Sequence, residues 1–358
     1  MSFFSNHRPF LIAGPCSAES RQQVLQTASV LSASNIDLFR AGVWKPRTRP
    51  GNFEGIGEPA LEWLKEVKKT LNLPVTIEVA EPTHIELALK YEIDVLWIGA
   101  RTVVNPFHVQ NLADCLKGIK IPVMVKNPVN PDIELWIGAI ERLEKAGITD
   151  IAAVHRGFSG YGSITGYRNH PNWLIPIEMK RRRPDVALIC DPSHISGNRD
   201  TVAEVAQKAM DLRFDGLMIE THINPSEALS DAKQQITPAE LQTLLSNLIV
   251  KDEYTEDMSC RVKMENIRQL IDTLDVEIID LIAKRMELSR RIGELKKEYN
   301  LTIYQPDRWR EIVATCTRRA EAHQISQAFV LEIYEKIHHE SIRTQLSVLE
   351  ELQNEIKH

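Results

Sequence analysis

The stretch Ile36-Asp-Leu-Phe-Arg-Ala-Gly-Val-Trp-Lys-Pro-Arg-Thr48 joins a short apolar run to a cluster of cations. The apolar run predicts a β-strand, and Arg40, Lys45 and Arg47 follow at its carboxyl end. Guanidinium groups bind carboxylates and phosphates through paired hydrogen bonds, and Pro46 restricts the backbone between the last two cations. The cluster therefore predicts a small ligand with two anionic groups. The alternative, a solvated basic loop, is disfavoured because other predicted strand ends repeat the same chemistry.

Eight short apolar runs occur between residues 10 and 250, and amphipathic segments such as Glu58–Leu71 separate them. Eight strand–helix units over this length predict an α/β fold, a closed (β/α)8 TIM barrel. A doubly wound open sheet is the alternative architecture. The eight predicted strands are Phe10–Gly14, Ile36–Ala41, Val75–Val79, Val95–Gly99, Val123–Lys126, Ile151–Val154, Val186–Ile189 and Gly216–Ile219.

Each predicted strand ends in a charged or reactive side chain or is soon followed by one. In a closed barrel, these carboxyl ends converge on one mouth, where the active sites of such barrels lie. A single charged strand end would mean little, but the pattern recurs on all eight strands. In chain order, the residues are Cys16, Arg40 with Lys45, Glu78, Arg101, Lys126, Arg156, His194, and Glu220 with Asp231.

The residues at the predicted mouth fall into two chemical sets. The cationic set lacks acidic partners nearby in sequence and suits a ligand that carries both phosphate and carboxylate. The second set combines a thiol, an imidazole and two carboxylates, which together suit a divalent transition metal with an open coordination position. Alone, Cys16 would be read as a buried small apolar residue, and His194 as a hydrogen-bonded loop residue. The cationic set is Arg40, Lys45, Arg101, Lys126 and Arg156, and the metal set is Cys16, His194, Glu220 and Asp231.

The composition changes after residue 250, so we expect the barrel at 1–250, a polar linker at 251–262 and a helical domain at 263–358. Apolar residues then recur at helical spacing, with a break before Pro306, which suits the first turn of a second helix ending near Ala322. A third helix is expected over about 326–353. Three helices cannot bury so long an apolar stripe, which predicts a homodimer, or a higher assembly, formed through this domain.

The whole-chain properties exclude several classes of function. The 358 residues are 43% hydrophobic and 26% charged, which is ordinary for a globular protein, and the net charge of -6 argues against nucleic-acid binding. The N-terminus lacks the apolar run of a signal peptide, and no segment reaches the length of a membrane span. The five cysteines are far apart without CxxC pairing, so we expect a reduced, cytoplasmic location.

Residues 1 to about 250 resemble the type Iβ group of 3-deoxy-D-arabino-heptulosonate 7-phosphate (DAHP) synthases. The resemblance implies a condensation of phosphoenolpyruvate with erythrose 4-phosphate that depends on one divalent metal ion, with Mn²⁺, Fe²⁺, Co²⁺ and Zn²⁺ all plausible. The related 3-deoxy-D-manno-octulosonate 8-phosphate synthases are the alternative, and the Lys-Pro-Arg-Thr run favours the heptulosonate enzyme. The motifs that carry the resemblance are Gly-Pro-Cys16-Ser, Arg40-Ala-Gly-Val-Trp-Lys45-Pro-Arg47-Thr48, Gly-Ala-Arg101, Val-Lys126-Asn, Asp191-Pro-Ser-His194 and Ile-Glu220-Thr-His.

The same resemblance assigns the residues of the barrel to ligands. Erythrose 4-phosphate is expected on Arg47 and Thr48. Phosphoenolpyruvate is expected on Arg40, Lys45, Arg101, Lys126 and Arg156, and the metal on Cys16, His194, Glu220 and Asp231.

Two cations, Arg285 and Lys296, fall where the apolar stripe of the helical region would face a packed interior, which indicates an anionic ligand. Nearly all of residues 264–352 resemble an AroQ-class chorismate mutase, which needs no cofactor. The matching motifs are Ile267-Arg268 with Leu274-Asp275, Arg285-Met-Glu-Leu, Ile292-Gly-Glu-Leu-Lys296, Asp307-Arg308 and Ser341-Ile-Arg-Thr-Gln345.

The resemblance also assigns roles in the mutase site. Arg268 lies 17 residues before Arg285, about 25 Å along one helix, so it is expected to come from the partner chain. Gln305 and Trp309 stand where this class often has acids that contact the substrate hydroxyl. The remaining assignments are Arg285 and Arg308 for anion contacts, Ser341 for a neighbouring polar contact, and Lys296 and Gln345 for the ether oxygen.

Together the two resemblances imply a bifunctional enzyme of aromatic amino-acid biosynthesis. The helical domain is also expected to transmit feedback inhibition by prephenate to the barrel. The alternative is a synthase whose helical domain binds a regulatory ligand without turnover.

Overall fold

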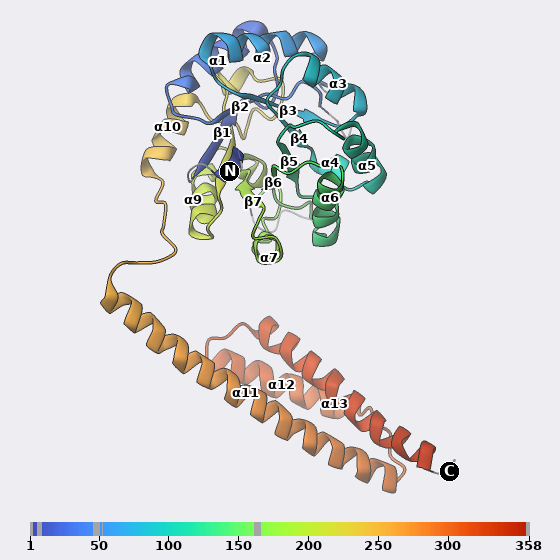
Figure 1. The fold of residues 1–358 in the computed structure, drawn as a ribbon. Coiled ribbons are helices and arrows are strands. Elements are labelled where there is room, and N and C mark those ends of the chain that lie inside the picture. Colours follow the sequence, from blue (N-terminus) through green and yellow to red (C-terminus); the bar gives the residue numbers. More distant parts are fainter. Residues whose placement is uncertain (1–2, 6–8, 46–50, 52, 161–165, 356–358) are drawn as a thin grey trace. The chain divides into compact units, whose positions relative to one another are not determined.

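The computed structural model describes residues 3–5, 9–45, 51, 53–160 and 166–355, with side chains described as far as residue 349. The chain divides into two compact units, Met1–Glu253 and Tyr254–His358 (Figure 1). Within the described residues, no helix combines the length and apolar character needed to cross a membrane.

The first unit is a closed barrel of eight parallel strands in the order of the chain, so the predicted TIM barrel is confirmed and the open sheet is excluded. The barrel closes where β1 pairs with β8, from Phe10 opposite Gly216 to Gly14 opposite Glu220. The strands are β1 (Phe10–Gly14), β2 (Leu38–Arg40), β3 (Val75–Val79), β4 (Val95–Ile98), β5 (Val123–Lys126), β6 (Ile151–His155), β7 (Ala187–Cys190) and β8 (Gly216–Glu220).

Helices surround the strands, as Figure 1 shows, and their starts follow from local sequence signals. The Ser20 side chain caps α1, and Thr237 with Glu240 forms a reciprocal capping box at α10. The helices of this unit are α1 (Arg21–Ser32), α2 (Glu58–Leu71), α3 (Pro82–Lys90), α4 (Ala100–Val103), α5 (Pro106–Cys115), α6 (Ile133–Lys145), α7 (Leu174–Arg182), α8 (Pro192–Ser196), α9 (Val202–Asp211) and α10 (Pro238–Asn247).

Two layers of apolar side chains position the barrel mouth. The larger core lies between strands and helices, and a second cluster includes Phe10, Ile12 and Met124. Phe3, Phe4 and Phe10 form edge-to-face pairs at 5.4–5.7 Å between ring centroids, at the start of β1. The apolar filling therefore includes the amino-terminal side of the barrel, and polar groups gather at the carboxyl ends of the strands.

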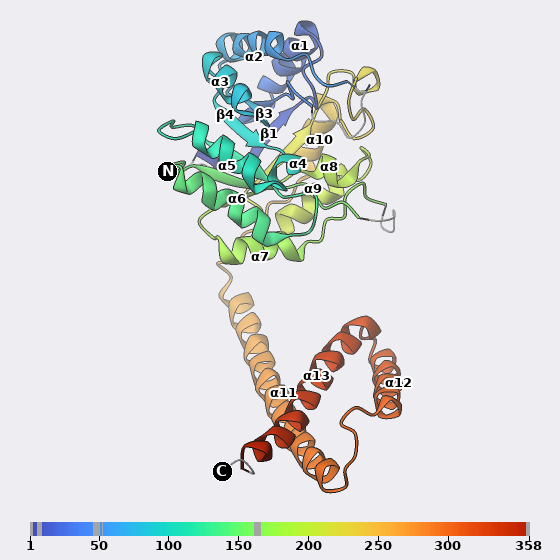
Figure 2. The same ribbon diagram turned by 90° about the vertical axis from the view of Figure 1, so that its right-hand side faces the viewer.

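The second unit consists of α11 (Met258–Glu298), α12 (Pro306–Ala322) and α13 (Gln327–Glu355), in agreement with the three predicted helices (Figure 2). The start of α11 at Met258 lies inside the stretch 251–262 that was expected to form a linker. Many apolar side chains of α11 are exposed in the single chain, as the predicted stripe requires. They include Ile267, Leu270, Ile271, Leu274, Ile278, Leu281, Leu288, Ile292 and Leu295.

Candidate active sites

Arg40 ends β2 and is almost fully buried. Its Nη2 lies 3.1 Å from Oε1 of Glu220, and its guanidinium carbon lies 5.1 Å from the centre of the Trp97 ring. Its Nε and Nη1 are buried and make no hydrogen bond within the described chain. Since a buried guanidinium with free donors is costly, these donors favour an anionic ligand.

Lys126 pairs with Asp191, whose Oδ2 lies 2.7 Å from the lysine Nζ. The same carboxylate accepts from the backbone N–H of His194 at 3.1 Å as the N-cap of α8, and lies 2.9 Å from Nδ1 of this imidazole. Asp191 therefore orients both a predicted substrate ligand and a predicted metal ligand. We expected the cations to lack acidic partners nearby in sequence, yet Arg40 and Lys126 find such partners through the fold, 180 and 65 residues away.

Arg156 is held by two asparagines at the carboxyl end of β6. Its Nη1 donates to Oδ1 of Asn169 at 2.8 Å, and its backbone N–H donates to Oδ1 of Asn127 at 2.7 Å. Burial, together with the nearby charges of Arg168 and Arg101, lowers the pKa of Arg156 to about 10, with Asp191 partly opposing it. An anion bound here would partly neutralise this buried cluster of positive charges.

Most of the residues predicted for the barrel mouth line a single cavity. Arg40 and Glu220 are not among the residues that line it. The predicted erythrose 4-phosphate ligands Arg47 and Thr48 fall outside the described residues. The cavity is lined by Lys45, Glu78, Gly99, Ala100, Arg101, Lys126, Val129, Arg156, Arg168, His194 and Asp231.

Three of the four predicted metal ligands form a compact group of donor atoms. One ligand atom each from Cys16, Glu220 and Asp231 lies within 4.8 Å of the others. The group does not include His194, but the Nε2 atom of this residue lies 3.8 Å from Oε1 of Glu220. Lys45 reaches the same place, with Nζ 3.2 Å from the Cys16 sulfur. A thiol, two carboxylates and an adjacent imidazole fit a divalent transition metal better than Mg²⁺ or Ca²⁺, which prefer oxygen ligands alone.

The protonation of these donors depends strongly on their surroundings. Burial and the negative charge of Glu220 raise the pKa of the Cys16 thiol to about 12. Burial also opposes ionisation of Asp231, but the neighbouring His194, Arg168 and Lys45 outweigh it and hold the pKa of this carboxyl below its ordinary value. A metal ion bound here would stabilise the thiolate, because its own charge becomes the largest in the site.

Sequence reasoning missed two residues of this site and used Asp191 only as part of a motif. The Gln234 side chain donates to Oε2 of Glu220 at 2.6 Å, and its carbonyl oxygen accepts from Nη1 of Arg168 at 2.6 Å. The same Arg168 atom lies 3.0 Å from Oδ1 of Asp231. The only signal in the sequence is that Gln234 follows Asp231 by three residues, and nothing near Arg168 indicates a role.

In the helical unit, α11 and α13 bring four of the predicted mutase residues into two pairs. Arg285 donates a short hydrogen bond to the Ser341 hydroxyl. The Lys296 Nζ lies 3.1 Å from Oε1 of Gln345 and also donates to the carbonyl of Ile303 at 2.5 Å. Lys296, Ser341 and Gln345 are buried. The Arg285–Ser341 pair precedes the Lys296–Gln345 pair on both helices, so α11 and α13 run in the same direction.

The two other predicted anion ligands lie on exposed helix surfaces. Arg308 pairs with Glu311 at 2.8 Å, and Arg268 lies 3.9 Å from Glu265. Arg308 and Arg285 line one cavity of about 470 Å³ with side chains of α12 and α13. Within one chain, the described structure does not bring Arg268 to Arg285, so this part of the predicted site is not formed by a single copy.

The two departures from the mutase pattern occupy defined places. Gln305 is the N-cap residue of α12 but makes no capping bond through its side chain. Trp309 stacks on His338, with ring centroids 4.4 Å apart and an angle of 19° between the planes. Neither position therefore supplies a carboxylate to this region.

Comparisons with known proteins identify the families to which the two units are similar. Residues 4–257 match the family described as DAHP synthetase I, and residues 267–346 match chorismate mutase type II. A phospho-2-dehydro-3-deoxyheptonate aldolase of Thermotoga maritima is 32% identical over 63% of this chain and 64% of its own length. A 2-dehydro-3-deoxyphosphooctonate aldolase of Vesicomyosocius okutanii is 28% identical over 70% of this chain and 93% of its own.

The solved structures point to the same family. The crystal structure of the DAHP synthase from Thermotoga maritima superposes with a TM-score of 0.60 at 30% identity, over 66% of this chain and 67% of that one. The chain thus belongs to the DAHP synthetase I family and continues into a helical domain of the chorismate mutase type II family.

Proposed function

We propose that the barrel condenses phosphoenolpyruvate with erythrose 4-phosphate to DAHP and phosphate, and that the helical domain rearranges chorismate to prephenate. The observation that carries the first activity is the cationic cavity beside the Cys16, Glu220 and Asp231 donor group. The observation that carries the second is the buried Lys296–Gln345 pair beside Arg285 and Ser341.

The barrel cations match the charges of phosphoenolpyruvate. Arg40, Lys126 and Arg156 offer buried donors for its carboxylate and phosphate. C3 of phosphoenolpyruvate forms the new carbon–carbon bond to the aldehyde carbon, water adds at C2, and phosphate leaves from that carbon. Clustered cations stabilise the negative charge on the departing phosphate.

We further propose that Cys16, His194, Glu220 and Asp231 hold one divalent metal ion. When bound, such an ion supplies Lewis-acid polarisation of the aldehyde carbonyl. The test assays both reactions on the purified chain, with and without chelator, and repeats them with Cys16→Ala. Chelation or the substitution should abolish synthase turnover and leave mutase turnover intact. Full synthase activity in metal-free buffer would reject the metal site.

The barrel has a rival substrate, because the relative from Vesicomyosocius okutanii is a 2-dehydro-3-deoxyphosphooctonate aldolase. Erythrose 4-phosphate and arabinose 5-phosphate, offered separately, discriminate between the two. We expect turnover with erythrose 4-phosphate, and turnover with arabinose 5-phosphate alone would favour the rival.

The mutase reaction needs no nucleophile, because holding the reactive conformer and stabilising charge on the breaking ether bond suffice. Arg285 and Arg308 can bind the carboxylates of chorismate, and Lys296 and Gln345 can donate to its ether oxygen. A helical domain that binds ligands without turnover is the alternative. Absence of mutase activity in the isolated domain and in the whole chain would support that alternative.

We propose that two copies of the chain complete the mutase site. The exposed apolar face of α11 requires a partner, and the exposed Arg268 has no route to Arg285 within one copy. Light scattering should give at least a dimer. In addition, a mixture of Arg268→Ala and Arg285→Ala chains should recover activity that neither has alone, since hybrid dimers contain one intact site. A monomeric chain with full mutase activity would refute this arrangement.

We also propose that prephenate bound to the helical domain inhibits the barrel. The physical requirement is a coupling free energy of about 1–3 kcal/mol between the two sites. The measurement is synthase rate against prephenate concentration, in the whole chain and in a truncated chain ending at Val250. Inhibition is expected only in the whole chain. An equal response in both would place any inhibitor site on the barrel.

A further inference from the structure

Gln235 lies at the junction of two segments that carry the proposed metal ligands. Its side chain is fully buried. Its Oε1 accepts from the backbone N–H of Cys16 at 2.9 Å, and its Nε2 donates to the backbone carbonyl of Ser230 at 2.8 Å. One amide group thus links the backbone of one ligand to the residue directly before another, Asp231.

Neighbouring contacts hold Gln235 in place beside the third ligand. Ile236 donates its N–H to the carbonyl of Glu220 at 3.0 Å, and Thr221 forms an isolated bridge with Ile236. The segment that contains Gln235 therefore runs beside the end of β8. Because Glu220 ends β8, these contacts fix the position of Gln235 relative to a strand of the barrel.

The backbone of Asp231 makes a sharp turn directly after Ser230. Its φ of 48° lies in the left-handed region, which among residues with a side chain Asn and Asp adopt most readily. The hydroxyl groups of Ser17 and Ser230 lie 2.5 Å apart and add a second link between the same two segments. The loop that carries Asp231 is thus held to the loop that carries Cys16 by two links that both meet at Ser230.

We propose that Gln235 is a positioning residue of the barrel metal site, which fixes the spacing of Cys16 and Asp231 before the cation binds. This inference rests on the metal site of the proposed function. Donors held at the right spacing lose less conformational freedom on binding, so a preorganised site binds its ion more tightly. Gln235 itself touches neither the ion nor the substrate.

The test measures Mn²⁺ affinity directly, by competition with a fluorescent chelator, on the full-length chain. Gln235→Met keeps the volume of the side chain and removes both hydrogen bonds. We expect the Kd for Mn²⁺ to rise about 10- to 100-fold, the usual effect of losing an outer-shell partner. Saturating Mn²⁺ should restore synthase kcat, because the catalytic groups remain, and mutase turnover of the same chain should not change.

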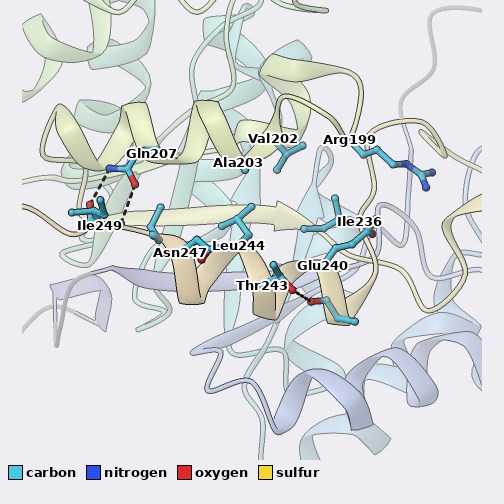
Figure 3. A pocket seen from close by; sticks show the side chains of 12 residues that line it. Arg199, Val202, Ala203, Gln207, Ile236, Glu240, Thr243, Leu244, Asn247 and Ile249 are labelled. Atoms are coloured by element: carbon cyan, nitrogen blue, oxygen red, sulfur yellow. Dashed lines mark hydrogen bonds between the residues drawn. The ribbon is translucent and has the colours of Figure 1, made fainter.

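Gln207 supplies a control on α9, outside the proposed metal site. Its side-chain amide also uses both polar atoms on backbone, but on a single residue: it accepts from the N–H of Ile249 at 2.9 Å and donates to its carbonyl at 3.0 Å (Figure 3). It lines a cavity between α9 and α10 that includes none of the proposed metal ligands. Gln207→Met should leave the Kd for Mn²⁺ unchanged.

The other outcomes are equally decisive. If Gln235→Met does not fold, Gln235→Asn replaces it, since an amide shortened by one methylene cannot span both backbone groups. Unchanged Mn²⁺ affinity in the folded variant overturns the proposal. Equal weakening by Gln207→Met also overturns it, because the effect would then be a general loosening of the barrel. If the unaltered chain binds no Mn²⁺ or other divalent transition metal, the metal site itself is wrong, which is a separate failure.

Discussion

His155 provides a pH-dependent test of how the end of β6 is built. The residue is completely buried, and four aromatic rings surround it with centroids 5.4–6.4 Å from its own. Burial lowers its pKa to about 3 from an ordinary 6.5. Its carbonyl accepts from the N–H of Asp191 at 2.7 Å, and Arg156 follows it directly, so this strand end supports the proposed active site. The perturbation is His155→Phe, which keeps an aromatic ring and removes the proton-binding group.

The sign and size of the effect follow from the two pKa values. Because the folded-state pKa is the lower one, protonation favours the unfolded chain. The stability associated with a neutral His155 is thus present above pH 6.5 and is lost progressively as the pH falls from 6.5 towards 3. The slope is about 1.4 kcal/mol per pH unit, so the unaltered barrel loses about 2 kcal/mol from this residue by pH 5. His155→Phe should not lose it.

The assay is urea unfolding of both full-length chains at pH 7.5 and pH 5, followed by tryptophan fluorescence. Trp309 is the single tryptophan of the six beyond residue 253, so the signal reports mainly on the barrel. The substitution itself changes the unfolding free energy by some amount at pH 7.5. Relative to that value, the difference between the two chains should shift by about 2 kcal/mol in favour of the variant at pH 5. The same difference at both pH values would refute a neutral, strongly buried His155.

Two further predictions concern the helical domain, and a third variant, in the barrel helix α6, serves as the comparison for the second. Lys296→Ala should lower mutase kcat by about 10²-fold, since losing one such donor costs about 3 kcal/mol, whereas a raised KM alone would indicate ordinary ground-state binding. A Cβ at Gly293 would lie 3.1 Å from Cα of Gln345, so Gly293→Ala should destabilise the helical unit and reduce mutase kcat. Gly138→Ala, where the added methyl meets no atom within 4 Å, should instead stabilise α6 by up to about 1 kcal/mol. Thermal unfolding and mutase kinetics compare the two glycines, and similar effects at both would contradict the packing argument.

The sequence by itself determined the barrel and the contents of its mouth. Short apolar runs alternating with amphipathic segments permit few arrangements, and parallel strands in a closed barrel bring their carboxyl ends together. Cys16 and Asp231 could therefore be grouped although 215 residues separate them. The helices of the second unit could also be predicted, because an apolar stripe at helical spacing and Pro306 mark them directly.

Only the tertiary structure decided which groups pair within each site. Lys126 meets Asp191, Arg40 meets Glu220, and Gln235 bridges Cys16 and Ser230 through side chains whose local sequence shows no such partner. The reason is physical: hydrogen bonds act over about 3 Å, whereas periodicity and turn signals place an element only to within a residue or two. Which buried donor faces which acceptor is therefore decided when the barrel closes.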